Sequence, residues 1–272
     1  NNHNSSSCNS LSVKFHFIAV VLLLCACAEN DGTVTFETIT ANKTVALSND
    51  SVPPTCSVTL RLEKATKESG RAGEIINSAV IHRLLDRDDE DMQVAADAFV
   101  EDYTSNYSKT LLPLYNQDRG DIAKRVWYYY YYIINSRTQR GSKGTLVYIA
   151  DINCREGGIN ALTQQIVMNF EEKTGRQLSY RDVFVEGFEA ALKPILLKAL
   201  KEYTGLTTIR ELKDKGYLRS MEIYVPDNFI LGDETITFIF NPDEIASETI
   251  GYTELTISYT EIENILNSSF EH

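Results

Sequence analysis

Apolar and polar residues alternate most regularly near the carboxyl end of the chain, over residues 219–262. Three runs there carry apolar side chains at every second position, which is the spacing of one face of a β-strand. The runs contain Met221, Ile223 and Val225, then Ile236, Phe238 and Phe240, then Leu255, Ile257 and Tyr259. Gly232-Asp233 lies between the first two runs and is typical of a hairpin turn, because glycine accepts positive φ. The pattern predicts an antiparallel sheet with one face exposed to solvent.

Elsewhere the spacing of apolar residues switches between that of strands and that of helices. Strands are predicted around residues 58–62, 127–134, 146–152 and 159–170, and helices over 72–85, 95–113, 188–203, 208–213 and 258–266. Because the helices cluster in the sequence instead of alternating with strands, we expect an α+β fold. We expect two small subdomains, residues 56–170 and 171–272, each with an antiparallel sheet that packs against helices.

The amino end has the features of an export signal. Lys14 precedes an apolar run over residues 15–24, which ends at Cys25-Ala26-Cys27. A basic residue, a short apolar stretch and a small-residue exit are typical of a secretory signal peptide, and the stretch is too short to span a bilayer. Leu24-Cys25-Ala26-Cys27 also resembles a bacterial lipobox, whose last cysteine is lipidated. We predict a signal peptide with a lipobox over residues 1–27 and lipidation at Cys27; an ordinary cleaved signal is the alternative.

Residues 28–55 are rich in Thr, Asn, Ser and Asp, and Pro53-Pro54 lie near their end. This composition predicts a flexible tether between a lipid anchor and the folded body. Such a protein would lie in the bacterial cell envelope, in the periplasm or on the outer-membrane surface. Two cysteines follow the tether, Cys56 and Cys154. Because an exported chain reaches an oxidising compartment, a disulfide between them is permitted, although the sequence does not decide whether it forms.

Charge narrows the class of partner. The chain of 272 residues has 43% apolar and 24% charged residues, as ordinary globular proteins do, but its net charge is −12. Strong acidity makes nucleic acid and anionic membrane surfaces poor partners, so any contact with the membrane is expected through the lipid anchor only. A cationic protein is a plausible partner.

The inventory of reactive residues argues against most enzymes. His82 is the only histidine of the predicted folded body that is not the last residue. Ser-His-Asp and histidine-zinc hydrolases are therefore nearly excluded, and the usual nucleotide-binding and acyl-transfer motifs are absent. We predict no catalytic residue, no metal site and no cofactor. The acidic run 86–91 lacks the central glycine of a calcium loop and is interpreted as a loop before a helix, where the helix dipole favours acids. A glycosidase needs only two carboxylates, so a carboxylate-dependent cell-wall hydrolase is the alternative function.

Trp127 and the five consecutive tyrosines 128–132 form the most aromatic stretch of the chain. On a strand, alternate side chains face opposite sides of the sheet, so one set should lie in the core. The other set can form an aromatic shelf for a sugar ring or a protein partner, because tyrosine adds contact area at low entropic cost. The candidate ligand-binding residues are Trp127, Tyr129 and Tyr131. Ordinary cross-strand packing of all six rings is the alternative.

From residue 169 onward the chain is similar to the carboxy-terminal module of RsiV-type and PdaC-type extracytoplasmic proteins, which also occurs in Bacteroidetes lipoproteins. The similarity rests on the order and spacing of Asn169-Phe170, Thr174-Gly175-Arg176, Leu178, Asp182-Val183-Phe184, Asn228-Phe229, Phe238, Asn241-Pro242, Glu244-Ile245-Ala246, Gly251 and Tyr259. Residues 57–170 resemble the domain that usually precedes this module. The resemblance implies an anchored envelope module that binds a ligand, which for RsiV is lysozyme.

The chain also departs from the pattern of that family. Gly157-Gly158-Ile159-Asn160 stands where members often have Gly-Gly-Ala-His, and Asp243 replaces a common tyrosine. No sigma-binding segment and no deacetylase domain is recognisable. We therefore expect a non-enzymatic lipoprotein of the cell envelope that binds a protein or glycan ligand, with lysozyme and peptidoglycan as the sharpest candidates. A purely structural or assembly subunit is a further possibility, for which a flat apolar patch would be the sign.

Overall fold

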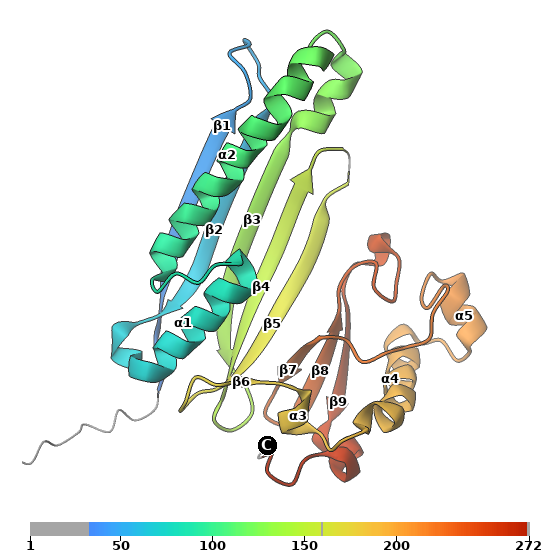
Figure 1. Cartoon of the computed structure of the whole chain (residues 1–272). Coiled ribbons are helices and arrows are strands. Elements are labelled where there is room, and N and C mark those ends of the chain that lie inside the picture. The colour runs from blue at the N-terminus through green and yellow to red at the C-terminus, as the bar shows by residue number, and fades with distance from the viewer. Residues whose placement is uncertain (1–32, 159, 271–272) are drawn as a thin grey trace, which may run out of the picture. The chain divides into compact units, whose positions relative to one another are not determined.

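The computed structural model describes residues 33–158 and 160–270. The predicted signal peptide, the lipidation site Cys27 and the first residues of the predicted tether lie outside these ranges. Within the described ranges, no helix is both long enough and apolar enough to cross a membrane. The described chain forms a six-stranded and a three-stranded sheet, each packed against helices (Figure 1). This arrangement confirms the expected α+β fold with two subdomains.

The first subdomain is built on the six-stranded sheet, whose strands are neighbours in the order β1 to β6. They are β1 (Phe36–Ala46), β2 (Thr55–Ala65), β3 (Tyr130–Arg140), β4 (Thr145–Glu156), β5 (Leu162–Glu171) and β6 (Gln177–Leu178). β2 and β3 are parallel, and the other neighbouring pairs are antiparallel. The parallel pair departs from the expected wholly antiparallel sheet, because the chain crosses between these strands through two helices.

Strand β1 corrects the prediction of a flexible tether over residues 28–55. It pairs with β2 along its whole length, from Phe36 opposite Ala65 to Ala46 opposite Thr55. Its residues alternate: Ala41 is buried, whereas the threonines and asparagine between the inward positions are exposed. The Thr- and Asn-rich composition that suggested a tether thus belongs to an edge strand whose outer face is exposed to solvent. Its β-branched residues favour the extended backbone.

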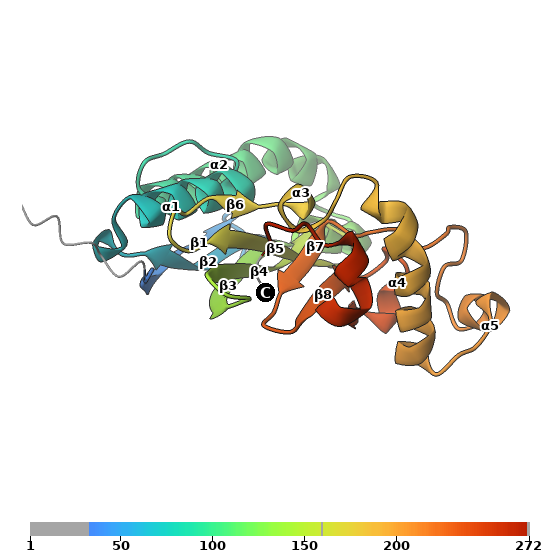
Figure 2. The ribbon, with the colours of Figure 1, turned by 90° about the horizontal axis from the view of Figure 1, so that it is seen from below.

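Helices α1 (Gly70–Leu85) and α2 (Met92–Asp118) lie on the same face of this sheet (Figures 1 and 2). Buried residues of both helices meet buried residues of the strands in one core that includes Val58, Leu60, Leu62, Ile76, Val80, Ala95, Ile134, Tyr148 and Phe170. The alternation of residues 58–62 therefore predicted β2 correctly. α2 extends past its expected end at Pro113, because Tyr115 in the following turn is buried and donates a hydrogen bond to Asp50 at 2.8 Å.

The acidic run over residues 86–91 connects α1 to α2. Asp86 ends α1 in the left-handed conformation, and the carboxylate of Asp91 accepts hydrogen bonds from the backbone N–H groups of Gln93 and Val94 at 2.9 and 3.1 Å. The ammonium of Lys64 and these N–H groups lower the pKa of Asp91. Asp91 is therefore the N-cap of α2, which confirms the interpretation of the run as a loop before a helix.

The second subdomain packs helices on one face of the three-stranded sheet. Its elements are α3 (Tyr180–Val183), α4 (Phe188–Thr204), α5 (Ile209–Asp214), β7 (Asn228–Leu231), β8 (Thr235–Phe240) and β9 (Thr253–Ser258). The 3-10 helices η3 (Glu248–Ile250) and η4 (Tyr259–Ile265) lie before and after β9. In the first subdomain, η1 (Lys67–Ser69) precedes α1 and η2 (Ile122–Tyr128) precedes β3. Leu192, Leu196 and Leu200 of α4 are fully buried in this core.

The first strand of the second sheet lies later in the sequence than the alternation of Met221, Ile223 and Val225 indicated. Those residues pair with no strand, Met221 is 43% exposed, and the strand is β7. Pro226 cannot donate a ladder hydrogen bond, which opposes a strand that runs through it. The other two predicted runs are confirmed as β8 and β9, and Gly232 closes the predicted hairpin turn with an N–H donated to the carbonyl of Thr235 at 2.8 Å.

Three asparagine side chains connect the two sheets. The amide of Asn228 accepts from the N–H of Val167 at 2.9 Å and donates to the carbonyl of Gln165 at 2.7 Å. Asn169 on β5 makes the reciprocal pair with β7, and Asn241 accepts from the N–H of Gln165 at 2.6 Å. An amide side chain that bonds a strand in this way replaces a neighbouring strand, so this asparagine joint satisfies the free edge of β5.

Candidate functional site

Trp127 lies in the 3-10 helix η2, which leads into β3, and not in the strand that its composition suggested. Its side chain is 58% exposed. The indole packs against Gly158, where a Cβ would lie 3.0 Å from ring atom Cζ3, and a Cβ on Gly157 would lie 2.6 Å from the Trp127 carbonyl oxygen. The Gly157-Gly158 turn at the end of β4 is therefore needed for this close approach, and it supports an indole that stays open to solvent.

One set of tyrosines packs into the core, as predicted. The ring of Tyr130 lies 5.2 Å from that of Tyr107, and the ring of Tyr132 lies 5.3 Å from that of Tyr103, both on α2. Burial is the main cause that raises the pKa of Tyr130 and of Tyr132. Tyr128, the last residue of η2, is buried as well and belongs to the same core.

Tyr131 faces the opposite side of the sheet, because its neighbours along β3 point to α2. The guanidinium of Arg155, which is its cross-strand partner, lies over the Tyr131 ring at 5.3 Å from the centroid. This is a cation–π contact, and the Nε of Arg155 has no hydrogen-bond partner within the described ranges. Tyr129 precedes β3 in an extended conformation and is half-buried. The predicted site thus divides into Tyr131 on one face of the sheet, Tyr129 directly before β3, and an indole beside the end of β4.

Tyr131 belongs to a larger surface. Strand registers place hydroxyl, amide and guanidinium groups in rows across the side of the sheet that faces away from α1 and α2, and none of their residues is buried. We call this surface the polar face; it comprises Thr40, Asn42, Thr44, Ser57, Thr59, Arg61, Tyr131, Asn135, Asn153 and Arg155. Its groups are partly ordered by one another: Thr44 and Ser57 share a hydrogen bond at 2.9 Å, and Asn153 donates to Thr163 at 2.9 Å.

The second subdomain covers the same side of the sheet beyond the polar face. Val147 and Ile149 on β4 and Val167 on β5 pack with Ile239 on β8 and with Tyr252. Burial is the main cause that raises the pKa of Tyr252, and the negative charge of Asp151 adds to it. The polar face is therefore bounded by an apolar contact at one end and by Trp127 at the other.

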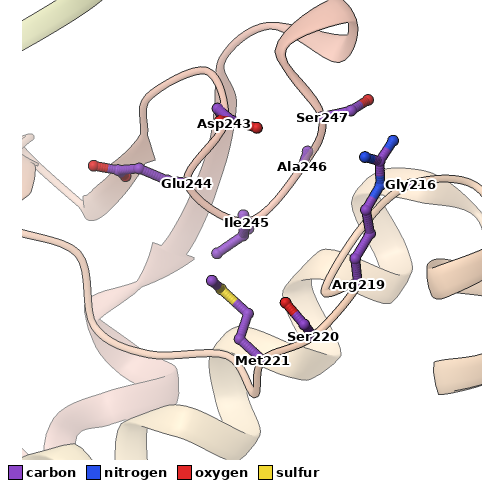
Figure 3. Close-up of a pocket in the computed structure, with 9 residues that line it drawn as sticks. All are labelled: Gly216, Arg219, Ser220, Met221, Asp243, Glu244, Ile245, Ala246 and Ser247. Atoms are coloured by element: carbon purple, nitrogen blue, oxygen red, sulfur yellow. The ribbon is translucent and has the colours of Figure 1, made fainter.

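A small pocket in the second subdomain offers less to a ligand. It lies between residues 216–221 and 243–247 and has a volume of about 110 Å³ (Figure 3). Met221 points toward Ile245, and the side chain of Glu244 points away (Figure 3). Glu244 accepts a hydrogen bond from the N–H of Asn241 at 2.9 Å. Because pockets for small organic ligands are several times larger, the Glu244-Ile245-Ala246 segment has a structural role here.

The histidine and the two cysteines of the described residues lie in different elements. His82 lies on α1 with a side chain that is 72% exposed, 3.5 Å from Asp88. No three His, Cys, Asp or Glu residues within the described ranges are placed to hold a metal ion. Cys56 and Cys154 are both free and buried, in β2 and β4. β3 separates these strands by about 9–10 Å. Cys56 lies beside Tyr130 whereas Cys154 lies opposite Tyr132, two positions further along β3, so the two cysteines are too far apart for a disulfide.

Sequence reasoning found the aromatic residues but not the face on which two of them lie. The polar face combines positions from four strands, and β1, which supplies Thr40, Asn42 and Thr44, was predicted to be part of a tether. The alternation of Thr38, Thr40, Asn42 and Thr44 with apolar residues was the available signal.

Comparison with known proteins finds similarity to a family of unknown function. A DUF3298 family protein from Bacteroides fragilis has a solved structure that is similar with a TM-score of 0.81 and 28% sequence identity, over 87% of this chain and 94% of that one. A DUF3298 family protein from Pseudomonas aeruginosa shares the fold with a TM-score of 0.60 at 15% identity, over 86% of this chain and 96% of that one. No curated protein matches the chain. Residues 181–260 match the family model described as "Protein of unknown function (DUF3298)", so the second subdomain carries the sequence features of that family.

Proposed function

We propose that the protein is a non-enzymatic binding module of the bacterial cell envelope, anchored by a lipid at Cys27, that recognises a cell-wall glycan on its polar face. The observation that carries the proposal is the combination of exposed or half-buried aromatic rings with rows of hydroxyl and amide groups. Sugar rings present apolar C–H faces and a rim of hydroxyls, so they match a surface that offers both kinds of contact. The resemblance to RsiV-type and PdaC-type modules supports an extracytoplasmic location.

A cationic protein such as lysozyme is a second candidate ligand. The net charge of −12 favours fast association with a basic partner through long-range attraction. The resemblance to RsiV-type modules points in the same direction. This candidate differs from the glycan in its salt dependence, because attraction between exposed charges weakens as ionic strength rises.

The carboxyl groups with displaced pKa values are not suited to act as the acid of a glycosidase. Among the described residues these groups all have a lowered pKa: Asp50, Glu68, Asp91, Asp118, Asp182 and Glu211. Hydrogen bonds from cations, hydroxyls or backbone N–H groups hold these values down, and in Asp182 they outweigh an opposing effect of burial. A glycosidase needs an acid whose pKa is raised, so that it is protonated at neutral pH. None of these six can supply that proton.

Fluorescence tests the glycan proposal directly, because Trp127 is the single tryptophan of the chain. The chain from residue 27 onward, with Cys27→Ser, is titrated with soluble peptidoglycan fragments while the emission of Trp127 is recorded. We expect a saturable change, and we expect Tyr131→Ala to weaken binding about 2- to 13-fold, the range for loss of one aromatic contact. Tyr203→Ala is the matched control, since Tyr203 is 54% exposed on α4, outside the polar face.

The outcomes separate the two ligands. Equal affinity of Tyr131→Ala and Tyr203→Ala would reject the polar face as the glycan site. Co-elution with lysozyme at low ionic strength, lost at high ionic strength, would favour the cationic protein. Release of reducing sugar from the fragments would contradict the non-enzymatic assignment.

A further inference from the structure

A second pocket, of about 530 Å³, lies at the end of the first sheet where β6 leads into α3. These two elements are neighbours in both views (Figures 1 and 2). The wall includes the β3–β4 turn, the turn before β6 and residues 267–270. We call this region the basic corner, after its charged lining residues Lys143, Lys173, Arg176, Arg181, Glu171 and Asp182.

The basic corner reverses the charge balance of the chain. It has four basic and two acidic side chains, whereas the whole chain has 26 basic and 38 acidic residues. Both acids pair with one cation: Arg176 hydrogen-bonds Asp182 and lies 4.0 Å from Glu171. Lys173 and Arg181 are exposed and form no ion pair within the described ranges. Lys173 and Arg181 therefore give the corner positive charge that Glu171 and Asp182 do not neutralise.

The shape of the basic corner is fixed by its turns. Gly175 has φ +75°, and a Cβ at this position would lie 2.3 Å from the carbonyl oxygen of Ala72 in α1. The N–H of Glu172 donates to the carbonyl of Gly144 at 2.8 Å, which joins the two turns of the pocket wall. Asp182 accepts from the N–H of Ser179 at 2.8 Å. The cations are thus presented by a preformed surface that does not have to order itself on binding.

The polypeptide enters the fold beside this corner. The N–H of Val34 donates to the carboxylate of Glu172 at 3.0 Å, and Arg140 pairs with the other oxygen of the same group. Glu172 directly precedes Lys173. Val34 follows Cys27 by seven positions, and a chain of that length reaches at most about 25 Å when fully extended. A membrane that holds a lipid at Cys27 would therefore lie within reach of the basic corner.

We propose that the basic corner binds the phosphate of anionic lipid headgroups and so orients the anchored protein on the membrane. This inference rests on the lipid anchor of the proposed function. Basic side chains near an anionic membrane surface each strengthen binding about fivefold. The corner at the membrane leaves the polar face, on another side of the first sheet, free for its ligand.

The net charge of the chain argued against an anionic membrane as a partner, and the basic corner qualifies that argument. Charges more than about 10 Å from the membrane are screened at physiological ionic strength. The acidic residues of the remaining surface therefore oppose local binding much less than the sum of charges suggests. Arginine and lysine at a concave site also match the phosphate group in geometry and charge.

Flotation with lipid vesicles tests the proposal without the anchor. The chain from residue 27 onward, with Cys27→Ser, is mixed with vesicles that contain phosphatidylglycerol or only phosphatidylcholine. We expect binding to the anionic vesicles alone, and a loss of about 30-fold for Lys173→Ala with Arg181→Ala. The control pair is Lys109→Ala with Lys215→Ala, which removes two exposed lysines on α2 and after α5.

Binding by the control pair and not by the corner variant would support the proposal. Equal binding by both, or no binding to anionic vesicles, would overturn it. Inorganic phosphate that binds the corner without any vesicle binding would overturn the assignment to lipid headgroups. The assay includes neither glycan nor a lipid at Cys27. Its failure is therefore distinguishable from failure of the proposed function, which is read from the Trp127 titration.

Discussion

The asparagine joint gives the strongest prediction on stability, and Asn228 is its central residue. Its side chain is 8% exposed and satisfies two backbone groups of β5, the N–H of Val167 and the carbonyl of Gln165. Asn228→Ala leaves the N–H of Val167 without its acceptor, whereas the carbonyl of Gln165 keeps a second donor, the side-chain amide of Asn241 at 3.2 Å. A buried polar group without a partner costs about 1–3 kcal/mol, so the change should lower the free energy of unfolding by about 1–3 kcal/mol.

That loss is a measurable fraction of the 5–15 kcal/mol that stabilises a typical domain. Urea unfolding followed by circular dichroism measures it, with Asn42→Ala as control because Asn42 is exposed on β1 and surface changes of this kind stay within about 0.5 kcal/mol. Hydrogen exchange at the Val167 amide gives a local readout, since this N–H loses its acceptor. A loss below about 1 kcal/mol, with unchanged protection of Val167, would refute the claim that Asn228 closes the edge of β5.

The remaining predictions concern a turn, two thiols and a helix cap. Gly175→Ala should lower the free energy of unfolding by about 2–4 kcal/mol, because it adds a clash with α1 to the cost of positive φ. Gly144→Ala is the control: Gly144 has φ +70° but open space around it, so the change should cost only about 1–2 kcal/mol. Thermal melting compares the two variants. Cys56 and Cys154 should react with a thiol reagent only after unfolding, since burial raises the pKa of both, that of Cys56 to about 11, and a disulfide-linked product would contradict the register. Backbone N–H groups of Thr208 and Thr207 lower the pKa of Glu211 from 4.5 to about 2. The ionised Glu211 therefore contributes fully to stability above pH 4.5, and this contribution disappears as the pH falls toward 2. Glu211→Gln should remove that part of the acid unfolding transition.

Local pattern was enough to predict most elements of the fold. Alternation located β2, β8 and β9, and the helical spacing of residues 72–85 located α1, because each of these elements buries one side against the core. The same rule explains the error at Met221, where alternation occurs without a pairing strand. The alternation of apolar residues does not reveal whether a strand is present to pair with. Pro226 and the backbone hydrogen bond from Leu218 to Ile245 keep the segment out of the sheet.

The joint between the sheets was beyond such reasoning. Asn169, Asn228 and Asn241 were recognised only as parts of a family pattern, and an asparagine in a sequence is as typical of turns and caps as of buried contacts. What assigns them a structural role is the geometry of one amide against the backbone of a strand that is about sixty residues away. Tertiary bonds of this kind have no signal in local composition.

The division between the two subdomains has a consequence for specificity. The family match covers residues 181–260, whereas every residue of the polar face, and Trp127 beside it, lies between positions 40 and 155. The second subdomain therefore supplies the boundary of that face and the closure of β5, but none of the side chains proposed to contact a glycan. Substitutions on the polar face leave both cores and the asparagine joint intact, because these side chains point away from the helices and none of them belongs to either core. A shared fold at 28% identity is thus compatible with a different ligand in each protein, and the residues to compare between them are those of β1 to β4, outside the segment by which the family is recognised.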